Sequence, residues 1–179
     1  MKKLISIAMG LTIALLSYAQ DTVNNFTIKD GTVTWTKVFE SQKAETAREW
    51  FLDHFDIERK ADAKLTGKTP ENVLPVQAVG LNINRVVLAI QHPCVVYFTV
   101  EFKEDRYRVR VNNIIWNPQM ALNAGGSFIG IGTIDLAELA LRRGQFAPAF
   151  LRHTGEELDM LLEFMFNAPA DYISEEEDW

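Results

Sequence analysis

The segment YFTVEFKEDRYRVRVNNI, Tyr97–Ile114, decides the fold because apolar and polar residues alternate in both of its halves. Such alternation on either side of a short turn predicts an antiparallel β-hairpin. If Glu104-Asp105 are the two turn residues, the following side chains lie opposite one another: Phe102 and Tyr107, Val100 and Val109, Phe98 and Val111, and on the other face Glu101 and Arg108. A single register therefore satisfies both faces of the hairpin.

A strand and a helix are predicted before the hairpin. TVTWTKVF, residues 32–39, alternates with period two and places Val33, Trp35 and Phe39 on one face. Ser41 is suited to cap the helix that follows. The apolar residues of this helix recur at helical spacing: Ala44, Ala47, Trp50, Phe51 and Phe55. We expect this apolar stripe to pack on the sheet.

Four further elements are predicted from weaker patterns. Residues 61–69 alternate and indicate a second strand, and a third strand is expected within residues 79–91. Asp135 and Glu138 form a capping pair for a short helix that ends before Gly144. A last helix is expected to start at Thr154, with Glu157 in the capping-box position, and to end at Asn167-Ala168-Pro169.

The first nineteen residues have the features of a signal peptide for export. A pair of lysines precedes an apolar run, residues 4–16, and the small residues Ser17 and Ala19 precede a polar segment. We therefore expect cleavage before Gln20 and an exported protein that is periplasmic or secreted. The apolar run is shorter than the roughly 20 residues of a membrane span, and no second long apolar run follows it, so no integral membrane segment is expected after cleavage.

The remaining chain is expected to form a single α+β domain, residues 20–170, followed by an acidic tail, residues 171–179. Because Cys94 is the only cysteine, no intramolecular disulfide is possible and the fold depends on its core. The chain has 18 Lys+Arg and 24 Asp+Glu, and loss of Lys2 and Lys3 would change the net charge from −6 to −8. This acidity argues against a nucleic acid as partner.

Four motifs within residues 26–115 resemble a family of secreted bacterial domains of unknown function: DGTVTWTKVFE, AREWFLDHF, LTGK and VVYFTVEFKEDRYRVRVNNI. The resemblance implies a TATA-binding-protein-like fold, in which a curved antiparallel sheet carries helices on one face in the order strand, helix, four strands, helix. The motifs are hydrophobic patterns rather than chemical signatures, so no catalytic residues are carried over. The fold alone does not imply DNA binding.

We expect no catalytic residue, metal site or cofactor from the other motifs. GGSFIGIG, Gly125–Gly132, matches neither a dinucleotide-binding nor a Walker loop. His92 and Cys94 are close in sequence, but Cys94 begins an apolar strand, where a thiol is usually buried and inert. His54, His92 and His153 lack metal-ligand spacing. Two alternatives stay open: a hydrolase-type enzyme with a site near the Gly125–Gly132 loop, and an assembly component that uses this apolar loop as its contact surface.

Three arginines of the hairpin share the sheet face opposite the aromatic one. With Tyr97 and the lysines of the preceding predicted strand, they form the candidate ligand-binding set: Arg106, Arg108, Arg110, Tyr97, Lys64 and Lys68. We expect a basic, concave surface on an otherwise acidic protein. Guanidinium and ammonium groups bind carboxylates and phosphates, so the expected partner is an anionic small molecule or an acidic peptide.

Two other uses of these arginines are consistent with the sequence. The arginines could simply be solvated or paired across strands, as Glu101 and Arg108 would be, and exposed pairs contribute only about 0–1 kcal/mol. The acidic residues Glu175–Asp178 could instead fold back as a tethered anion. The sequence thus predicts a non-enzymatic binding or interaction domain whose exposed sheet face is its contact surface, and it leaves the partner open.

Overall fold

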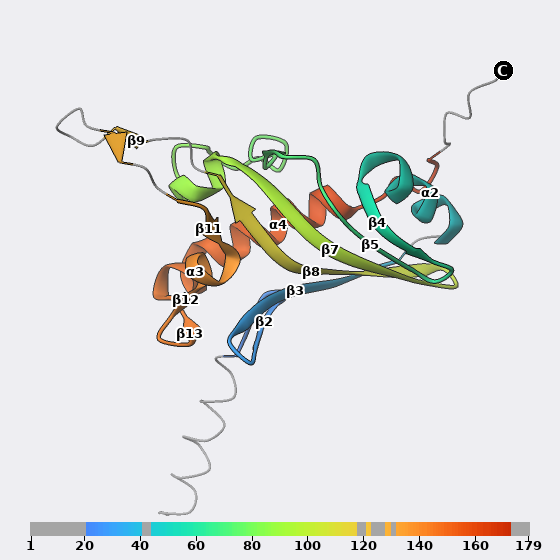
Figure 1. Ribbon diagram of the computed structural model, residues 1–179, viewed down its shortest axis with the longest axis horizontal. Helices are drawn as coiled ribbons and strands as arrows, with labels where there is room; N and C mark the ends of the chain where they lie inside the picture. The colour runs from blue at the N-terminus through green and yellow to red at the C-terminus, as the bar shows by residue number, and fades with distance from the viewer. Residues whose placement is uncertain (1–20, 41–43, 118–120, 123–127, 130–131, 173–179) are drawn as a thin grey trace, which may run out of the picture.

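The computed structural model describes residues 21–40, 44–117, 121–122, 128–129 and 132–172 (Figure 1). The predicted signal peptide, the Ser41 cap and residues 173–179 of the acidic tail lie outside the described residues. Within the described part, none of the helices is long and apolar enough to cross a membrane.

The described chain is an α+β protein with a large antiparallel sheet and three α-helices. The strands are β1 Thr22–Val23, β2 Phe26–Lys29, β3 Thr32–Glu40, β4 Asp56–Ala61, β5 Lys64–Lys68, β6 Asn72–Val73, β7 Pro93–Lys103, β8 Arg106–Trp116, β9 Ala121–Leu122, β10 Phe128–Ile129, β11 Ile134–Asp135, β12 Leu141–Arg142 and β13 Gln145–Phe146. The helices are α2 Ala44–His54, α3 Leu136–Ala140 and α4 Gly155–Phe166, with a 3-10 turn η1 Leu88–Gln91 and a π turn η2 Phe150–Thr154.

The main sheet has nine strands, seven of them in the order β1-β2-β3-β8-β7-β5-β4. Its centre is the β7–β8 hairpin, and the predicted register is confirmed: Phe102 pairs with Tyr107, Val100 with Val109, Phe98 with Val111 and Glu101 with Arg108. The predicted strand at residues 32–39 is also confirmed, as β3, which pairs with β8. The alternating pattern therefore fixes which side chains of three adjacent strands point to the same face.

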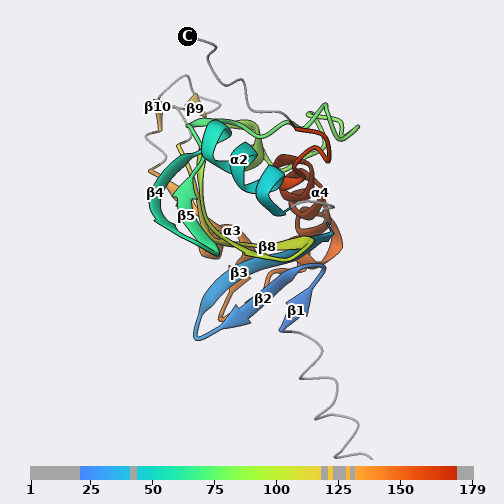
Figure 2. The ribbon, with the colours of Figure 1, turned by 90° about the vertical axis from the view of Figure 1, so that its right-hand side faces the viewer.

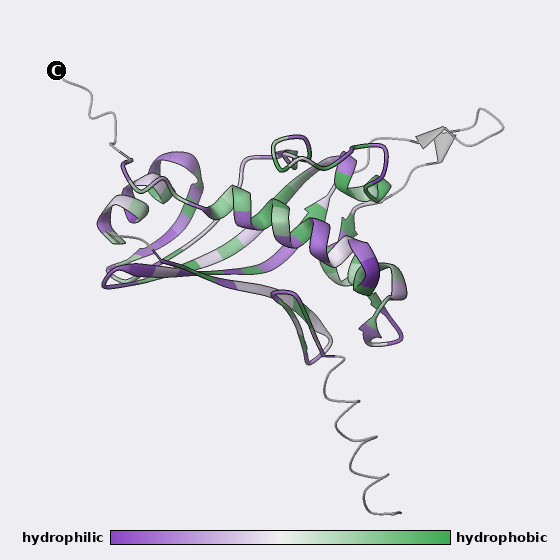
Figure 3. Cartoon of the chain, turned by 180° about the vertical axis from the view of Figure 1, so that it is seen from behind, coloured by the Kyte–Doolittle hydropathy of each residue, from purple (hydrophilic) through white to green (hydrophobic). Residues whose placement is uncertain are grey.

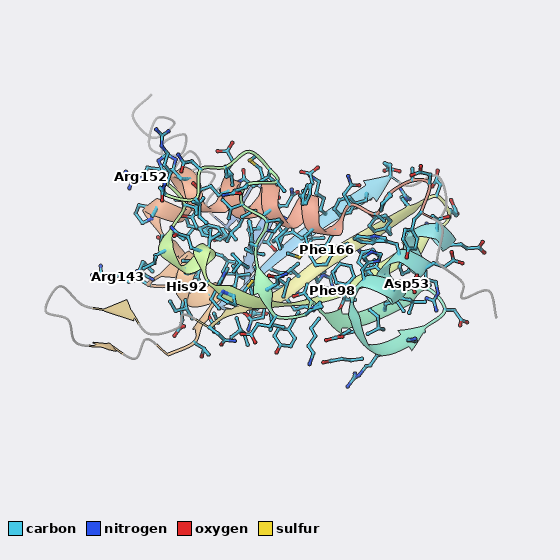
Figure 4. All side chains as sticks on the ribbon, turned by 90° about the horizontal axis from the view of Figure 1, so that it is seen from above. Asp53, His92, Phe98, Arg143, Arg152 and Phe166 are labelled. Carbon is cyan, nitrogen blue, oxygen red and sulfur yellow. The ribbon has the colours of Figure 1, made fainter. Side chains whose placement is uncertain are left out.

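Helices α2 and α4 cover much of the inner face of this sheet, and α3 also contacts β3 and β8. Figure 2 shows the sheet curving around α2 and α4. Phe98 of β7 lies between them, with its ring centroid 5.8 Å from that of Phe51 in α2 and 5.1 Å from that of Phe166 in α4 (Figure 4). All three rings are fully buried. The aromatic half of the hairpin thus forms the contact between the sheet and both helices, and the predicted packing of the apolar stripe of residues 44–55 on the sheet is confirmed.

Tyr107 adds a polar contact to this aromatic core. Its hydroxyl donates a hydrogen bond to the Phe166 carbonyl oxygen at 2.9 Å and accepts one from the Ala168 N–H at 2.8 Å. Burial raises the pKa of the Tyr107 hydroxyl to about 12, so the group stays protonated at neutral pH. The two bonds join the sheet to the end of α4, where the backbone groups lack helical partners.

Two predictions about the preceding strands need correction. Residues 61–69 form a turn at Asp62-Ala63 followed by β5, and β5 pairs with the unpredicted strand β4. No strand lies within residues 79–91, which form turns and η1. The position beside β7 is taken by β5, and the buried Val86 and Ile90 cover the core from the loop.

These two errors leave the predicted order of helices and strands unchanged. If the two-residue strands and the five-residue α3 are left aside, the chain from residue 32 runs β3, α2, β4, β5, β7, β8, α4. This is the predicted order strand, helix, four strands, helix, with the missed β4 taking the place of the strand expected at 79–91. Figure 3 shows hydrophilic residues along β4 and at the tip of the β7–β8 hairpin, where the sheet meets solvent.

The two helices after the hairpin agree with the prediction in part. The Asp135–Glu138 capping box is present, but α3 ends at Ala140 and Leu141 continues into β12. The predicted cap at Thr154 is wrong, because Thr154 is itself helical and the π turn η2 runs directly into α4. The helix ends at Phe166, followed by Asn167 as predicted.

Gly67 in β5 allows the close approach of β4, and its replacement is expected to destabilise the fold. A Cβ at Gly67 would lie 2.5 Å from the Asp56 carbonyl oxygen, so the strands would have to separate. We expect Gly67→Ala to lower the free energy of unfolding by about 1–3 kcal/mol in a urea titration. Gly132→Ala is the control, because a Cβ at the exposed Gly132 would meet nothing within 4 Å beyond its chain neighbours. Equal stability of the two variants would contradict the close approach.

Candidate functional site: the outer sheet face

The six predicted ligand-binding residues lie on one face of the sheet, opposite the helices. Arg106, Arg108 and Arg110 come from β8, and all three are exposed. Tyr97 of β7 pairs with Lys68 of β5, and Glu101 pairs with Lys64 at the other end of β5. Side chains of adjacent strands that are directly paired point to the same side, so the strand register brings these residues together.

The expected concave shape of this face is wrong. The helices fill the concave side of the sheet (Figure 2), so the arginines lie on its outer side. The reason is that the bulky aromatic side chains are buried more fully on the concave side, where the sheet curves around the helices. Within the described residues no helix covers the arginines, which keeps their guanidinium groups in contact with solvent.

Glu101 binds two of the predicted cations. The Arg108 guanidinium donates to Glu101 Oε2 through Nη2 and through Nε at 3.1 Å, and Lys64 Nζ lies 3.8 Å from Glu101 Oε1. The hydrogen bond from Arg108 holds the pKa of Glu101 below its ordinary value, so its carboxylate is ionised at neutral pH. The predicted cross-strand pairing of Glu101 and Arg108 is therefore present.

Lys68 is paired through the strand that sequence reasoning missed. Its Nζ lies 3.7 Å from Glu58 Oε1 of β4, at the point where the register of β4 shifts. Tyr97 beside it is half-buried. The edge of the face formed by β4 and β5 thus has its own internal charge pair and is less available to an external anion.

Three cations of this face have no such partner. Arg106 and Lys103 face each other at the last pair of the β7–β8 hairpin, and Arg110 follows further along β8, opposite Thr99. No hydrogen bond or ion pair joins any of the three side chains to another described residue. All three are exposed, but after the larger effect of Arg108 the charge of Arg110 also lowers the pKa of Glu101. Arg106 and Lys103 are therefore the two whose positive charges face solvent without a fixed counter-charge among the described residues.

A hollow of about 560 Å³ lies over this part of the face. Its lining includes one branched aliphatic side chain and five charged ones: Val38, Lys64, Glu101, Lys103, Arg106 and Arg108. Val38 was not predicted as a site residue. Its signal in the sequence is that it is the one aliphatic residue on the threonine-bearing face of TVTWTKVF, and it is 48% exposed.

The other sequence candidates do not join this face. Cys94 is buried, and burial raises the pKa of its thiol to about 12, with a smaller effect from the charge of Glu71. His54 stacks on Trp50 within α2 and its ring Nδ1 lies 3.0 Å from the Trp50 carbonyl oxygen. Among the described residues no group of three or more His, Cys, Asp or Glu could hold a metal ion. Most of the Gly125–Gly132 loop lies outside the described residues.

Sequence comparisons give no assignment for the chain. No family model matches it, and no curated protein matches it in sequence.

Two solved structures are similar to the chain. One is described as a TBP-like protein from Parabacteroides distasonis, with 10% sequence identity, a TM-score of 0.43, and coverage of 77% of this chain and 87% of that one. The other is described as a DUF4468 family protein from Bacteroides ovatus, with 15% identity, a TM-score of 0.43, and coverage of 87% and 98%. These are the kinds of protein that the sequence resemblance named.

The buried thiol gives a direct chemical prediction. Because the pKa of Cys94 is about 12, almost none of it is thiolate at pH 8, and only the thiolate reacts rapidly with disulfide reagents. We expect the native protein to react with an aromatic disulfide reagent at least about a hundredfold more slowly than the urea-unfolded protein. Rapid labelling of the folded protein at pH 8 would show that the thiol is accessible and ionised.

Proposed function

We propose that this protein is an exported, non-enzymatic binding domain that holds an anionic partner, a small molecule or an acidic peptide, on the outer face of its sheet. The observation that carries the proposal is the pair of exposed cations, Arg106 and Lys103, that have no fixed counter-charge among the described residues, on a chain of net charge −6. An acidic protein has no general attraction for anions, so a local cationic face favours a specific contact.

The arrangement of charges supports binding better than catalysis. Among the described residues that line the hollow, Glu101 supplies the one carboxylate, and that group is held by Arg108 and Lys64. The other charged groups that line it are ammonium and guanidinium groups, which bind anions. An open hollow with this lining suits recognition of a carboxylate or phosphate.

We further propose that the protein acts in the periplasm or outside the cell. The support is the predicted signal peptide, residues 1–19, with its basic start, apolar run and small residues before Gln20.

Anion binding is tested by titrating the full mature chain with acetate in a calorimeter at low salt. We expect Arg106→Gln combined with Lys103→Gln to weaken binding by about tenfold or more, because contacts from charged donors contribute about 1.5–3 kcal/mol each. Arg85→Gln combined with Arg143→Gln removes the same charge from exposed arginines outside the hollow and is the matched control. If both double variants weaken binding equally, the effect depends on net charge alone, and the proposed binding face is overturned.

Export is tested by expressing the full chain in a Gram-negative host and sequencing the N-terminus of the product. We expect a periplasmic or secreted protein that begins at Gln20, because Ser17 and Ala19 occupy the small-residue positions before the cut. A product that keeps Met1 and stays in the cytoplasm would contradict export.

A further inference from the structure

The cations that line the hollow on the outer face form two pairs. One pair, Arg108 and Lys64, is bound to Glu101. The other pair, Arg106 and Lys103, consists of direct cross-strand neighbours at the last pair of the hairpin, and neither has an ion pair with a described residue. Glu40 of β3 pairs in register with Arg106, yet no ion pair joins them. The hollow therefore offers one position for a negative charge of a ligand, beside Arg106 and Lys103.

An aliphatic surface lies beside that place. Val38 of β3 is directly opposite Arg108, the next residue of β8 on this face after Arg106, and it lines the same hollow. Val38 is 48% exposed, and its neighbours on this face of β3, Thr36 and Glu40, are polar. An apolar group of a ligand that covered Val38 would remove apolar surface from water, which stabilises a complex.

Glu101 limits the charge that the hollow accepts. Its ionised carboxylate lines the hollow and stays there because Arg108 and Lys64 hold it. A second charge on the ligand would be brought towards a like charge, which is unfavourable. A monoanion that reaches only Arg106 and Lys103 avoids this repulsion, so a carboxylate is favoured over a phosphate dianion.

We propose that the hollow binds a monocarboxylate with a short aliphatic body, its carboxylate on Arg106 and Lys103 and its aliphatic part on Val38. The volume of about 560 Å³ lies within the range of small-ligand sites, roughly 300–1,000 Å³. This inference rests on the proposed function and adds the ligand class and two residues, Val38 and Lys103. The same chemistry occurs in a free short-chain acid and in the C-terminal residue of a peptide.

The experiment compares four probes by calorimetry on the full mature chain. Hexanoate has both parts of the proposed ligand, acetate lacks the aliphatic body, hexanamide lacks the charge, and N-acetyl-leucine represents a peptide C-terminus. We expect hexanoate to bind about tenfold more tightly than acetate, which corresponds to burial of about two methylene groups. Hexanamide should not bind measurably. Tighter binding of N-acetyl-leucine than of hexanoate would indicate a peptide end, and the reverse order a free acid.

Variants locate each part of the ligand. Val38→Thr keeps the shape of the side chain but adds a hydroxyl, and it should reduce hexanoate binding to the level of acetate while leaving acetate unchanged. Val87→Thr changes another exposed valine, outside the hollow, and is the matched control. Lys103→Gln should weaken both anions, and Glu101→Gln should strengthen both because it releases Arg108 and Lys64. A thermal melt of each variant verifies folding.

Failure of this inference differs from failure of the proposed function. If hexanoate binds no better than acetate, or if Val38→Thr has no effect on hexanoate, the aliphatic part is wrong, although acetate binding that depends on Arg106 and Lys103 would still support an anion-binding face. If none of the monocarboxylates binds, acetate included, both proposals are overturned.

Discussion

The register of the β7–β8 hairpin decides which of its side chains face the helices and which face solvent. With Glu104-Asp105 at the turn, Phe98 and Tyr107 point to the helices and Arg106 and Arg108 point to solvent. A slip of one residue would place the arginines against the helices and leave the aromatic rings in water. Burial of a large aromatic side chain is worth about 1.5–3 kcal/mol, so the aromatic half keeps the cationic half on the outside.

The same register arranges the charges of the outer face. Because Val38, Arg108, Glu101 and Lys64 are successive partners across four strands, Glu101 lies between the two cations that it binds. The next pair on this face towards the turn, Lys103 and Arg106, has two cations and no carboxylate within ion-pair distance among the described residues. Anion binding at this face would thus depend on strand pairing more than on the number of arginines in the sequence.

Sequence reasoning succeeded where the two faces of a strand differ in polarity. It predicted both central hairpin strands, β3, and the shared face of all six candidate residues. It missed β4 because this edge strand is almost wholly exposed and has no alternation. It placed a strand at 79–91 because apolar residues such as Val86 and Ile90 are buried there without being in the sheet. The ion pair of Lys68 with Glu58 depends on β4, so it followed only from the structure. Val38 had a signal in the alternation of β3, and the structure adds that it lines the hollow.

The most direct test of a ligand site on the outer face is a map of backbone amide chemical shifts in the isotope-labelled mature protein during a titration with hexanoate. We predict that the largest changes fall at the end of the hairpin, in residues 101–103 and 106–108, and at Val38 of β3. Residues of the loop at 76–92 and of α3 should change little. Changes centred on that loop, or no saturable change at all, would contradict a ligand site on the outer face of the sheet.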